Sequence, residues 1–146
     1  MDLILWRHAD AEDGSPDSAR ALTERGREQA RRVAAWLKPR LPGRCEVLVS
    51  PAARAQQTAL ALAVPFVTSP VVGTDASAAE VLAAADLPVR AATLLIVGHQ
   101  PTLGRVAAML LSGAQADWDI GKGALWWLSS PSSRIVLRAV VDPELL

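Results

Sequence analysis

The sequence predicts one α/β domain over residues 1–146, a three-layer α/β/α architecture with a mostly parallel central sheet of about five to six strands. Short runs rich in Leu, Ile and Val alternate along the chain with amphipathic segments of helical length, so helices are expected on both faces of the sheet. No repeat, low-complexity tract or linker divides the chain. A chain of 146 residues is also long enough to bury one ordinary core.

The individual elements follow from local patterns. Apolar side chains recur every three to four residues between positions 30 and 37, which predicts a helix over residues 22–37 with Thr23 as its N-cap. Residues 93–97 form the most strand-like run, and the last two strands are expected to be antiparallel at one edge. The predicted strands cover residues 3–6, 46–49, 64–72 (a proline-interrupted edge strand), 93–97, 124–128 and 135–141, and the predicted helices cover residues 22–37, 50–63, 77–85 and 102–111.

Composition and charge exclude several classes of protein. Fifteen basic residues balance fifteen acidic ones, so no overall field favours nucleic acid or an anionic membrane surface as a partner. No apolar stretch approaches the ~20 residues that a membrane-spanning helix needs. The N-terminus lacks the pattern of a secretory signal, and Cys45 is the only cysteine, which favours a reducing compartment. We therefore expect a cytoplasmic protein.

Polar side chains follow three of the predicted strands at the point where each strand ends. Arg7 and His8 come directly after the first strand, Ser50 and Arg54 follow the second, and His99 follows residues 93–97. Because ligands of parallel sheets bind at the carboxyl ends of the strands, these side chains are expected to meet in one crevice. Both histidines of the chain occupy such a position.

Two predicted helix starts indicate what this crevice binds. Ser50-Pro51 and Gln100-Pro101 each place a capping side chain before a proline at the first helical position. Helix N-termini offer unpaired N–H groups and about half a positive charge, and Arg54 adds a cation in the first turn, where the macrodipole disfavours one. A bound anion removes this conflict. Two guanidinium forks with imidazole donors suit a phosphoryl group, so a phosphate or sulfate ion is the expected occupant.

Four segments resemble, in order, the motifs of the histidine phosphatase superfamily, whose fold is phosphoglycerate mutase-like, and above all its bacterial SixA-type phosphohistidine phosphatases. Arg7-His8-Ala9 is similar to the R-H-G motif. Residues 17–26 (DSARALTERG) resemble D-S-x-R-x-L-T-x-x-G, residues 50–58 (SPAARAQQT) resemble S-P-x-x-R-A-x-Q-T, and residues 98–103 (GHQPTL) resemble G/S-H-x-P-x-L/V. The resemblance covers the chain from Met1 to about Gly104.

The resemblance implies a metal-independent phosphatase without a cofactor. His8 would be the nucleophile that becomes a phosphohistidine, Arg7 and Arg54 would bind the phosphoryl oxygens, and His99 would donate to them. Arg20 and Ser50 would be further phosphate-binding residues. The substrate implied is a histidine-phosphorylated partner protein, of the kind that serves signal transduction.

The sequence departs from the family pattern at two points. Position 9 is Ala where Gly is usual, which would be strained if the backbone there had a positive φ. The region that holds a general acid in larger family members is compressed, which leaves Asp10, Asp75 and Glu80 as candidate acids. Phosphate esters need an acid to protonate the leaving alkoxide, whereas imidazole is a better leaving group. The missing acid therefore favours phosphohistidine as substrate, in an open crevice without long insertions.

Other functions remain open at this stage. A phosphoprotein-binding module without catalysis would keep Arg7 and Arg54, and a small-molecule phosphomonoesterase would use the same site. His8, His99 and Asp10 could form a two-histidine, one-carboxylate metal site, although Arg7 would repel the cation. Ser50 lacks the G-x-S-x-G surroundings of a serine hydrolase.

Overall fold

The computed structural model describes residues 1–86 and 92–146, and its centre is a six-stranded sheet of order β3-β2-β4-β1-β5-β6. The strands are β1 (Asp2–Arg7), β2 (Cys45–Val49), β3 (Val67–Thr68), β4 (Thr93–Gly98), β5 (Leu125–Ser129) and β6 (Val136–Val141). The first four run parallel to one another, and β5 is antiparallel to both β1 and β6. The predicted parallel sheet with an antiparallel edge is confirmed.

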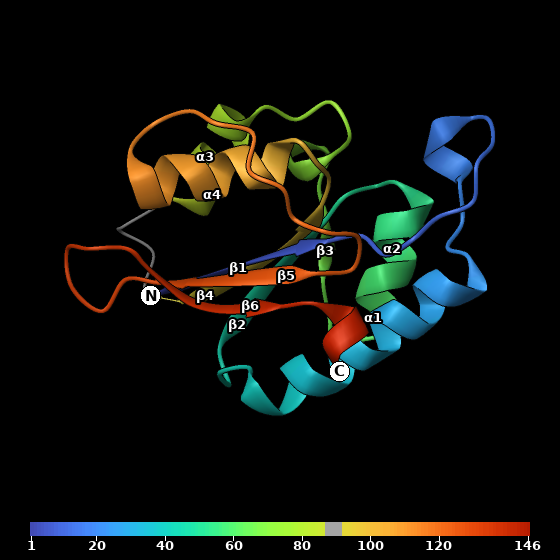
Figure 1. The fold of residues 1–146 in the computed structure, drawn as a ribbon, viewed down its shortest axis with the longest axis horizontal. Coiled ribbons are helices and arrows are strands. Elements are labelled where there is room, and N and C mark those ends of the chain that lie inside the picture. Colours follow the sequence, from blue (N-terminus) through green and yellow to red (C-terminus); the bar gives the residue numbers. More distant parts are fainter. Residues whose placement is uncertain (87–91) are drawn as a thin grey trace.

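Helices cover both faces of the sheet, as the sequence predicts (Figure 1). They are α1 (Glu24–Leu37), α2 (Ala53–Leu60), α3 (Ala78–Ala85) and α4 (Thr102–Ser112). The helices α1 and α2 lie on one face over an apolar core that includes Ile4 and Leu95, and α3 and α4 lie on the other over Leu5 and Ile96. Successive residues of a strand point to opposite faces, so β1 and β4 supply side chains to both cores and are buried throughout their centres.

Helix α1 begins where the sequence predicts, because Thr23 accepts a hydrogen bond from the Gly26 N–H at 2.9 Å. The first turn of α1 packs against the loop that follows β1. A Cβ at Gly26 would lie 1.9 Å from the Asp10 carbonyl oxygen, so only glycine allows this approach. The N-terminus of α1 is thereby held against the loop that carries His8.

Two predicted helix starts are wrong in detail. Helix α2 begins at Ala53 with Ala52 as its N-cap, so Ser50 does not cap it. In α4 the N-cap is Pro101, and the Gln100 side chain accepts from the Gly104 N–H at 2.7 Å. Both prolines thus lie one or two residues before the first helical position.

The predicted edge strand over residues 64–72 is shorter than expected. Only Val67–Thr68 pairs with β2, and a 3-10 helix over Pro70–Val72, capped by the Ser69 side chain, follows it. Proline at position 70 cannot donate to a sheet, which explains the early end. In the part of the chain that the structure describes, no helix has the length and apolar character to cross a membrane.

Candidate active site

The two histidines lie next to each other at the carboxyl edge of the sheet. His8 follows β1 and His99 follows β4, neighbouring parallel strands in which Arg7 is opposite Gly98. The backbone N–H of His8 donates to the Gly98 carbonyl at 3.0 Å, and the two imidazole centroids are 5.2 Å apart. Only 8% of His8 and 5% of His99 is exposed. The sheet topology therefore brings both histidines into one site, as the sequence predicts.

The His8 ring is held in one tautomer by its own loop. Its Nδ1 lies 2.8 Å from the Ala9 carbonyl oxygen, which can only accept, so Nδ1 carries the proton and Nε2 keeps its lone pair. Burial lowers the pKa of His8 to about 4, assisted by the positive charges of Arg54, Arg7 and Arg20 and opposed by the bond to Ala9. At neutral pH the ring is uncharged and its Nε2 is a potential nucleophile.

His99 contacts the serine that follows β2. Its Nε2 lies 2.7 Å from the Oγ of Ser50, a fully buried residue whose Oγ also accepts from the Ala52 N–H at 3.2 Å. Ser50 therefore orients the His99 ring and does not cap a helix. Burial, assisted by the neighbouring His8 and Arg54, lowers the pKa of His99 to about 3.

Arg7 and Arg54 each keep one buried donor without a partner, the Nε of the guanidinium. Arg7 donates from Nη1 to the Ile120 carbonyl at 2.9 Å, and burial lowers its pKa. Arg54 donates from Nη1 to the Asp17 carbonyl at 2.9 Å and from Nη2 to the Asp17 carboxylate at 3.0 Å. Since buried donors are normally satisfied, the two Nε–H groups indicate a site for an acceptor.

Asp17 contacts two of the predicted site residues, Arg20 and Arg54, and the sequence reasoning missed it. It begins the 3-10 helix Asp17–Ala19 in the loop after β1, and its carboxylate bridges Arg54 and Arg20. The hydrogen bonds from Arg20 and then from Arg54 lower the pKa of Asp17. Arg20 also donates from Nε to the Glu12 carbonyl at 2.7 Å. Asp17 stands in the D-S-x-R segment, but its spacing alone does not indicate a contact 37 residues along the chain.

Thr58 is a second missed residue, and it supports the loop at Ala9. Its buried Oγ1 accepts from the Ala9 N–H at 3.0 Å and donates to the Arg54 carbonyl at 2.7 Å. Ala9 is fully buried against Leu22 and Ala30, and its φ is not positive. The alanine at this position is therefore unstrained, and the departure from the usual glycine costs the backbone nothing.

The candidate acids differ in their surroundings. The Asp10 carboxylate accepts from Lys122 at 3.0 Å and from the Thr23 hydroxyl at 2.8 Å, and these bonds lower its pKa. Glu80 forms a capping box with Ser77 at the start of α3, which lowers its pKa as well. Carboxyl groups held as anions in structural contacts are poor proton donors.

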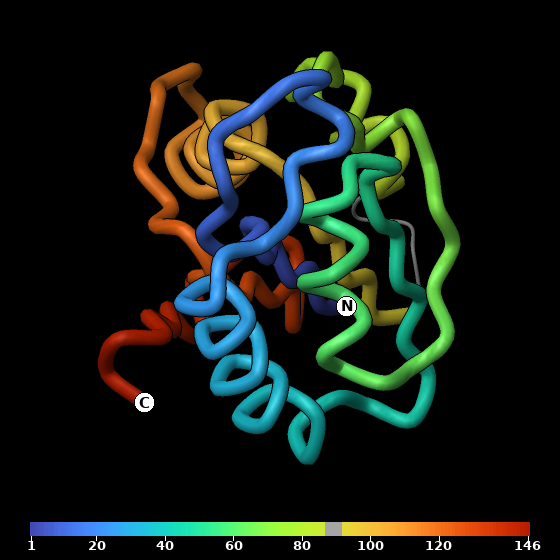
Figure 2. The backbone as a smooth tube through the Cα atoms, turned by 90° about the vertical axis from the view of Figure 1, so that its right-hand side faces the viewer, coloured from blue at the N-terminus to red at the C-terminus, as the bar shows by residue number. Residues whose placement is uncertain are grey.

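Asp75, the third candidate acid, lines a groove that also contains Ser50. The loop after β1 crosses the carboxyl end of the sheet (Figure 2), and a groove of about 310 Å³ opens beside Ser50 at this end. The residues that line the groove are Ser18, Ser50, Pro51, Ala52, Pro70, Gly73, Thr74 and Asp75. Of the three candidate acids, only Asp75 lines it.

The structure does not assemble the metal site considered from the sequence. Lys122 holds the Asp10 carboxylate, and no group of three or more potential metal ligands occurs among residues 1–86 and 92–146.

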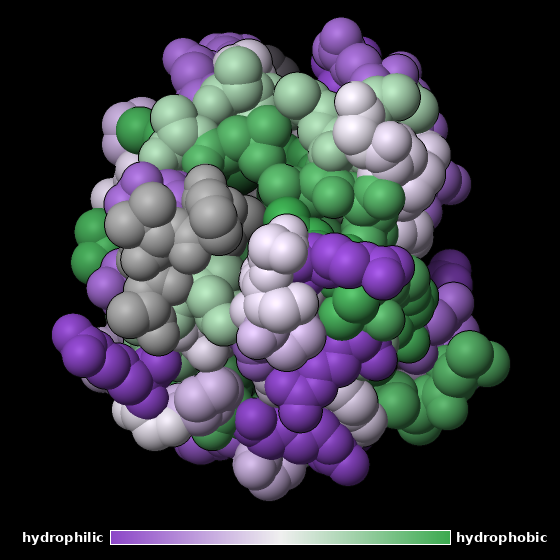
Figure 3. Space-filling view, turned by 90° about the vertical axis from the view of Figure 1, so that its left-hand side faces the viewer, coloured by the Kyte–Doolittle hydropathy of each residue, from purple (hydrophilic) through white to green (hydrophobic). Residues whose placement is uncertain are grey.

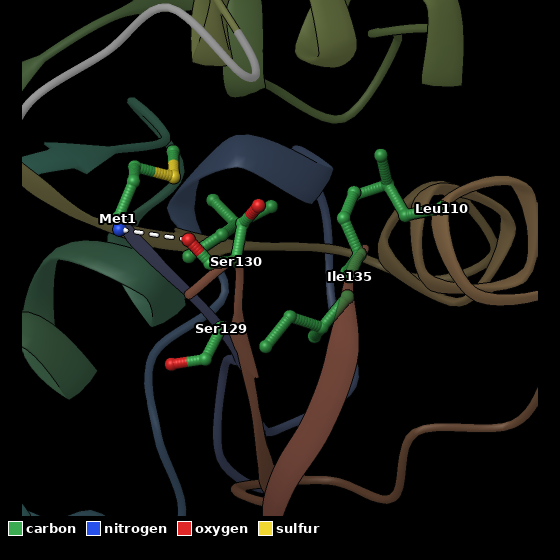
Figure 4. A pocket seen from close by; sticks show the side chains of 7 residues that line it. Met1, Leu110, Ser129, Ser130 and Ile135 are labelled. Atoms are coloured by element: carbon green, nitrogen blue, oxygen red, sulfur yellow. Dashed lines mark hydrogen bonds between the residues drawn. The ribbon is translucent and has the colours of Figure 1, made fainter. Parts of the chain in front are cut away.

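The opposite end of the sheet has a different character. A hollow of about 10 Å³, room for about one water molecule, opens there among apolar side chains (Figures 3 and 4). The N-terminal ammonium donates to the Ser130 carbonyl at its rim. Its lining residues are Met1, Leu3, Leu110, Leu128, Ser129, Ser130 and Ile135. With no charged side chain, this hollow does not resemble an anion site.

Comparison with known proteins agrees with the geometry. The chain is 29% identical to "Phosphohistidine phosphatase SixA" of Escherichia coli (strain K12), over 96% of this chain and 100% of that protein. It is also similar to a solved structure of the protein histidine phosphatase SixA complexed with tungstate, with a TM-score of 0.86, 26% identity and 99% of each chain covered.

A more distant structure shares the fold alone. This is a phosphoserine phosphatase mutant from Entamoeba histolytica in complex with phosphoserine, with a TM-score of 0.75 at 17% identity, covering 99% of this chain and 98% of that one. The sequence itself matches the family described as "Histidine phosphatase superfamily (branch 1)" over residues 3–81, more than half of its length. With two buried histidines beside Arg7 and Arg54 at the carboxyl edge of the sheet, the chain belongs to the histidine phosphatase superfamily.

Proposed function

We propose that residues 1–146 form one phosphatase domain, which removes the phosphoryl group from phosphohistidine in a partner protein through a covalent intermediate on His8. One observation carries the proposal. The bond from Nδ1 to the Ala9 carbonyl leaves Nε2 of an uncharged imidazole free, close to the charges of Arg7, Arg54 and Arg20. A nucleophile for phosphorus needs such a lone pair, and a phosphoryl group needs such cations.

The reaction proceeds in two transfers. Nε2 of His8 attacks phosphorus, the bond from phosphorus to the substrate nitrogen breaks, and the leaving imidazole keeps the electron pair and takes a proton from water. A water molecule then attacks the phosphorus, the bond to Nε2 breaks, and inorganic phosphate leaves. Both transfers expel an imidazole nitrogen, and water is the nucleophile of the second. The protein therefore supplies mainly position and charge.

The cationic groups stabilise the charge on the phosphoryl oxygens. The guanidinium groups of Arg7 and Arg54 each keep an unpartnered Nε–H group, and charge-assisted bonds in a buried site are stronger than exposed ones. Anionic oxygens beside His99 would raise its pKa from about 3 and favour its role as a donor. Arg20 and Ser50 would act next to these groups, through Asp17 and His99 respectively.

Two observations support phosphohistidine as the substrate. Asp10 and Glu80 are engaged elsewhere, which disfavours substrates that need a strong acid. The Escherichia coli relative is described as a phosphohistidine phosphatase, and the tungstate-bound structure as a protein histidine phosphatase. Asp75 favours a second candidate, hydrolysis of small phosphomonoesters, because its position on the groove beside Ser50 would allow it to protonate an alkoxide. A cytoplasmic location and independence of metal stay predictions.

The substrate is tested with three compounds, a phosphohistidine protein, p-nitrophenyl phosphate and a sugar phosphate, and with the wild type, His8→Asn and Asp75→Asn in the presence of EDTA. We expect the wild type to hydrolyse the first rapidly, the second slowly and the third very little, and His8→Asn to hydrolyse none. Asp75→Asn should keep the activity on phosphohistidine.

Other results have distinct meanings. Preference for the esters, lost in Asp75→Asn, would favour the monoesterase. Binding of the phosphoprotein without turnover would indicate a non-catalytic module. Equal turnover by the wild type and His8→Asn would exclude His8 as the nucleophile.

A further inference from the structure

A buried glutamine on α1 makes two hydrogen bonds that the proposed chemistry does not use. Gln29 is 6% exposed, on the helix face that otherwise packs apolar residues such as Ala30 and Val33. Its Oε1 accepts from the Asp10 N–H at 2.9 Å, and its Nε2 donates to the Glu144 carboxylate at 3.1 Å. A buried amide is costly unless it is bonded in this way, so both contacts fix the orientation of the side chain.

The bond to Asp10 acts on the peptide group that holds His8. The Asp10 N–H and the Ala9 carbonyl belong to one planar peptide unit, and the Ala9 oxygen accepts from His8 Nδ1 at 2.8 Å. In a trans peptide the N–H and the carbonyl point in opposite directions. Because Gln29 holds the N–H, the carbonyl stays directed at Nδ1.

The contacts on the preceding peptide unit are separate from this one. There the His8 carbonyl accepts from the Gly123 N–H at 3.0 Å, and the Ala9 N–H donates to Thr58. These bonds place the Cα of His8, whereas the next unit determines which ring nitrogen carries the proton. Gln29 acts on that next unit.

We propose that Gln29 is a positioning residue that fixes the tautomer of His8 through the Ala9–Asp10 peptide, and that Glu144 in the C-terminal 3-10 turn anchors the Gln29 amide. The turn, Pro143–Leu145, lies against α1 (Figure 1), and Glu144 also accepts from Arg25 at 3.2 Å. The importance of the tautomer for turnover rests on the proposed function. The tautomer itself does not.

The test measures the tautomer directly, by ¹⁵N NMR of histidine-labelled protein at pH 7 without substrate. The chain has two histidines, so His99→Asn assigns the His8 signals. In the wild type we expect a protonated Nδ1 and an unprotonated Nε2. Gln29→Met, which keeps the side-chain volume and removes both hydrogen bonds, should give a mixture of tautomers and move the two ¹⁵N shifts toward each other.

Two further variants separate positioning from general damage. In the exchanged pair Gln29→Glu/Glu144→Gln, the carboxylate at position 29 can still accept from the Asp10 N–H, and the amide at position 144 can donate to that carboxylate. The wild-type shifts should therefore return. Arg25→Ala removes the other hydrogen bond to Glu144 and should leave the shifts unchanged, whereas Glu144→Ala should move them part of the way.

Turnover gives a second readout. We expect Gln29→Met to lower kcat by about tenfold, as loss of a bond that orients a functional histidine does elsewhere. The affinity for tungstate should change less than twofold, because Arg7 and Arg54 are untouched. Wild-type ¹⁵N shifts in a folded Gln29→Met would overturn the proposal. If that variant does not fold, identical shifts in Glu144→Ala and Arg25→Ala would overturn it.

The two proposals fail separately. If the tautomer responds as described but His8 never carries phosphate, the proposed function is wrong and the role of Gln29 stands. If His8 carries phosphate but its tautomer ignores residues 29 and 144, the positioning role alone is wrong.

Discussion

At the scale of single residues, each reactive group of this site has a hydrogen-bond partner that fixes its tautomer or its orientation. The Ala9 carbonyl selects one tautomer of His8, and Ser50 orients His99. Asp17 accepts one hydrogen bond from each terminal nitrogen of Arg54, so the guanidinium is oriented while its Nε–H has no partner. The site is thus organised before an anion binds, which lowers the reorganisation that catalysis requires.

Arg54→Lys tests the importance of the guanidinium geometry. Lysine keeps the positive charge but cannot hold two bonds to Asp17 and donate from a third nitrogen. We expect kcat/KM for a phosphohistidine protein to fall by about 10–100-fold, the value of one charge-assisted hydrogen bond. Arg105→Lys is the matched control, because Arg105 pairs with Asp117 on the surface, and it should leave kcat/KM unchanged. Equal effects of the two substitutions would contradict the role of Arg54.

The strands and helices bring these side chains together at one end of the sheet. The ends of β1, β2 and β4 carry His8, Ser50 and His99, and the start of α1 presses on the loop after β1. Gly26 lies directly against the Asp10 carbonyl, one peptide unit beyond the group that holds His8. The site therefore depends on helix packing as well as on the strands.

Gly26→Ala tests this approach. Alanine favours helices by about 1 kcal/mol over glycine, but its Cβ would lie 1.9 Å from a backbone oxygen, so the loop or the helix must move. We expect the free energy of unfolding in urea to fall by about 2–4 kcal/mol, and turnover to fall with it. Gly43→Ala meets no atom within 4 Å and should change stability by less than ~0.5 kcal/mol. Equal stability of the two variants would contradict the close packing.

The sequence predicts the elements better than it predicts their contacts. Periodicity and turn residues indicate every strand and α-helix described, though not the short 3-10 helices or all of the exact ends, because those signals are local. The contact of Ser50 with His99 joins residues 49 apart, and that of Asp17 with Arg54 joins residues 37 apart. Ser50-Pro51 therefore resembles a helix cap in the sequence, although the hydroxyl serves a histidine in the fold. The positions of residues 7, 8, 50, 54 and 99 at strand ends predict that these segments meet, but neither that pattern nor the motifs indicate the two contacts.

At the scale of the whole molecule, burial of two neutral histidines couples folding to pH. Unfolding would return both rings to a pKa of about 6.5, whereas the folded values are about 4 and about 3. Between these limits the unfolded chain binds more protons than the native one. The two histidines therefore contribute stability that is complete above pH 6.5 and is lost as the pH falls toward their folded pKa values.

We expect the free energy of unfolding to fall by about 1.4 kcal/mol per pH unit for each histidine below pH 6.5. Urea unfolding at several pH values between 7.5 and 5.0 measures this slope, in a range above the titration of most carboxyl groups. His8→Asn should show about half the slope, because one histidine remains. A flat profile in the wild type would contradict the burial of neutral histidines.

The central claim is that Nε2 of His8 accepts the phosphoryl group. The most direct test is to mix the protein with a phosphohistidine protein, quench within milliseconds in base, and locate the phosphate by tandem mass spectrometry. The account predicts an acid-labile, base-stable phosphate on His8, attached at Nε2, which disappears as inorganic phosphate forms and is absent from His8→Asn. Turnover with no phosphate on His8 at any time, or with phosphate on another residue, would contradict it.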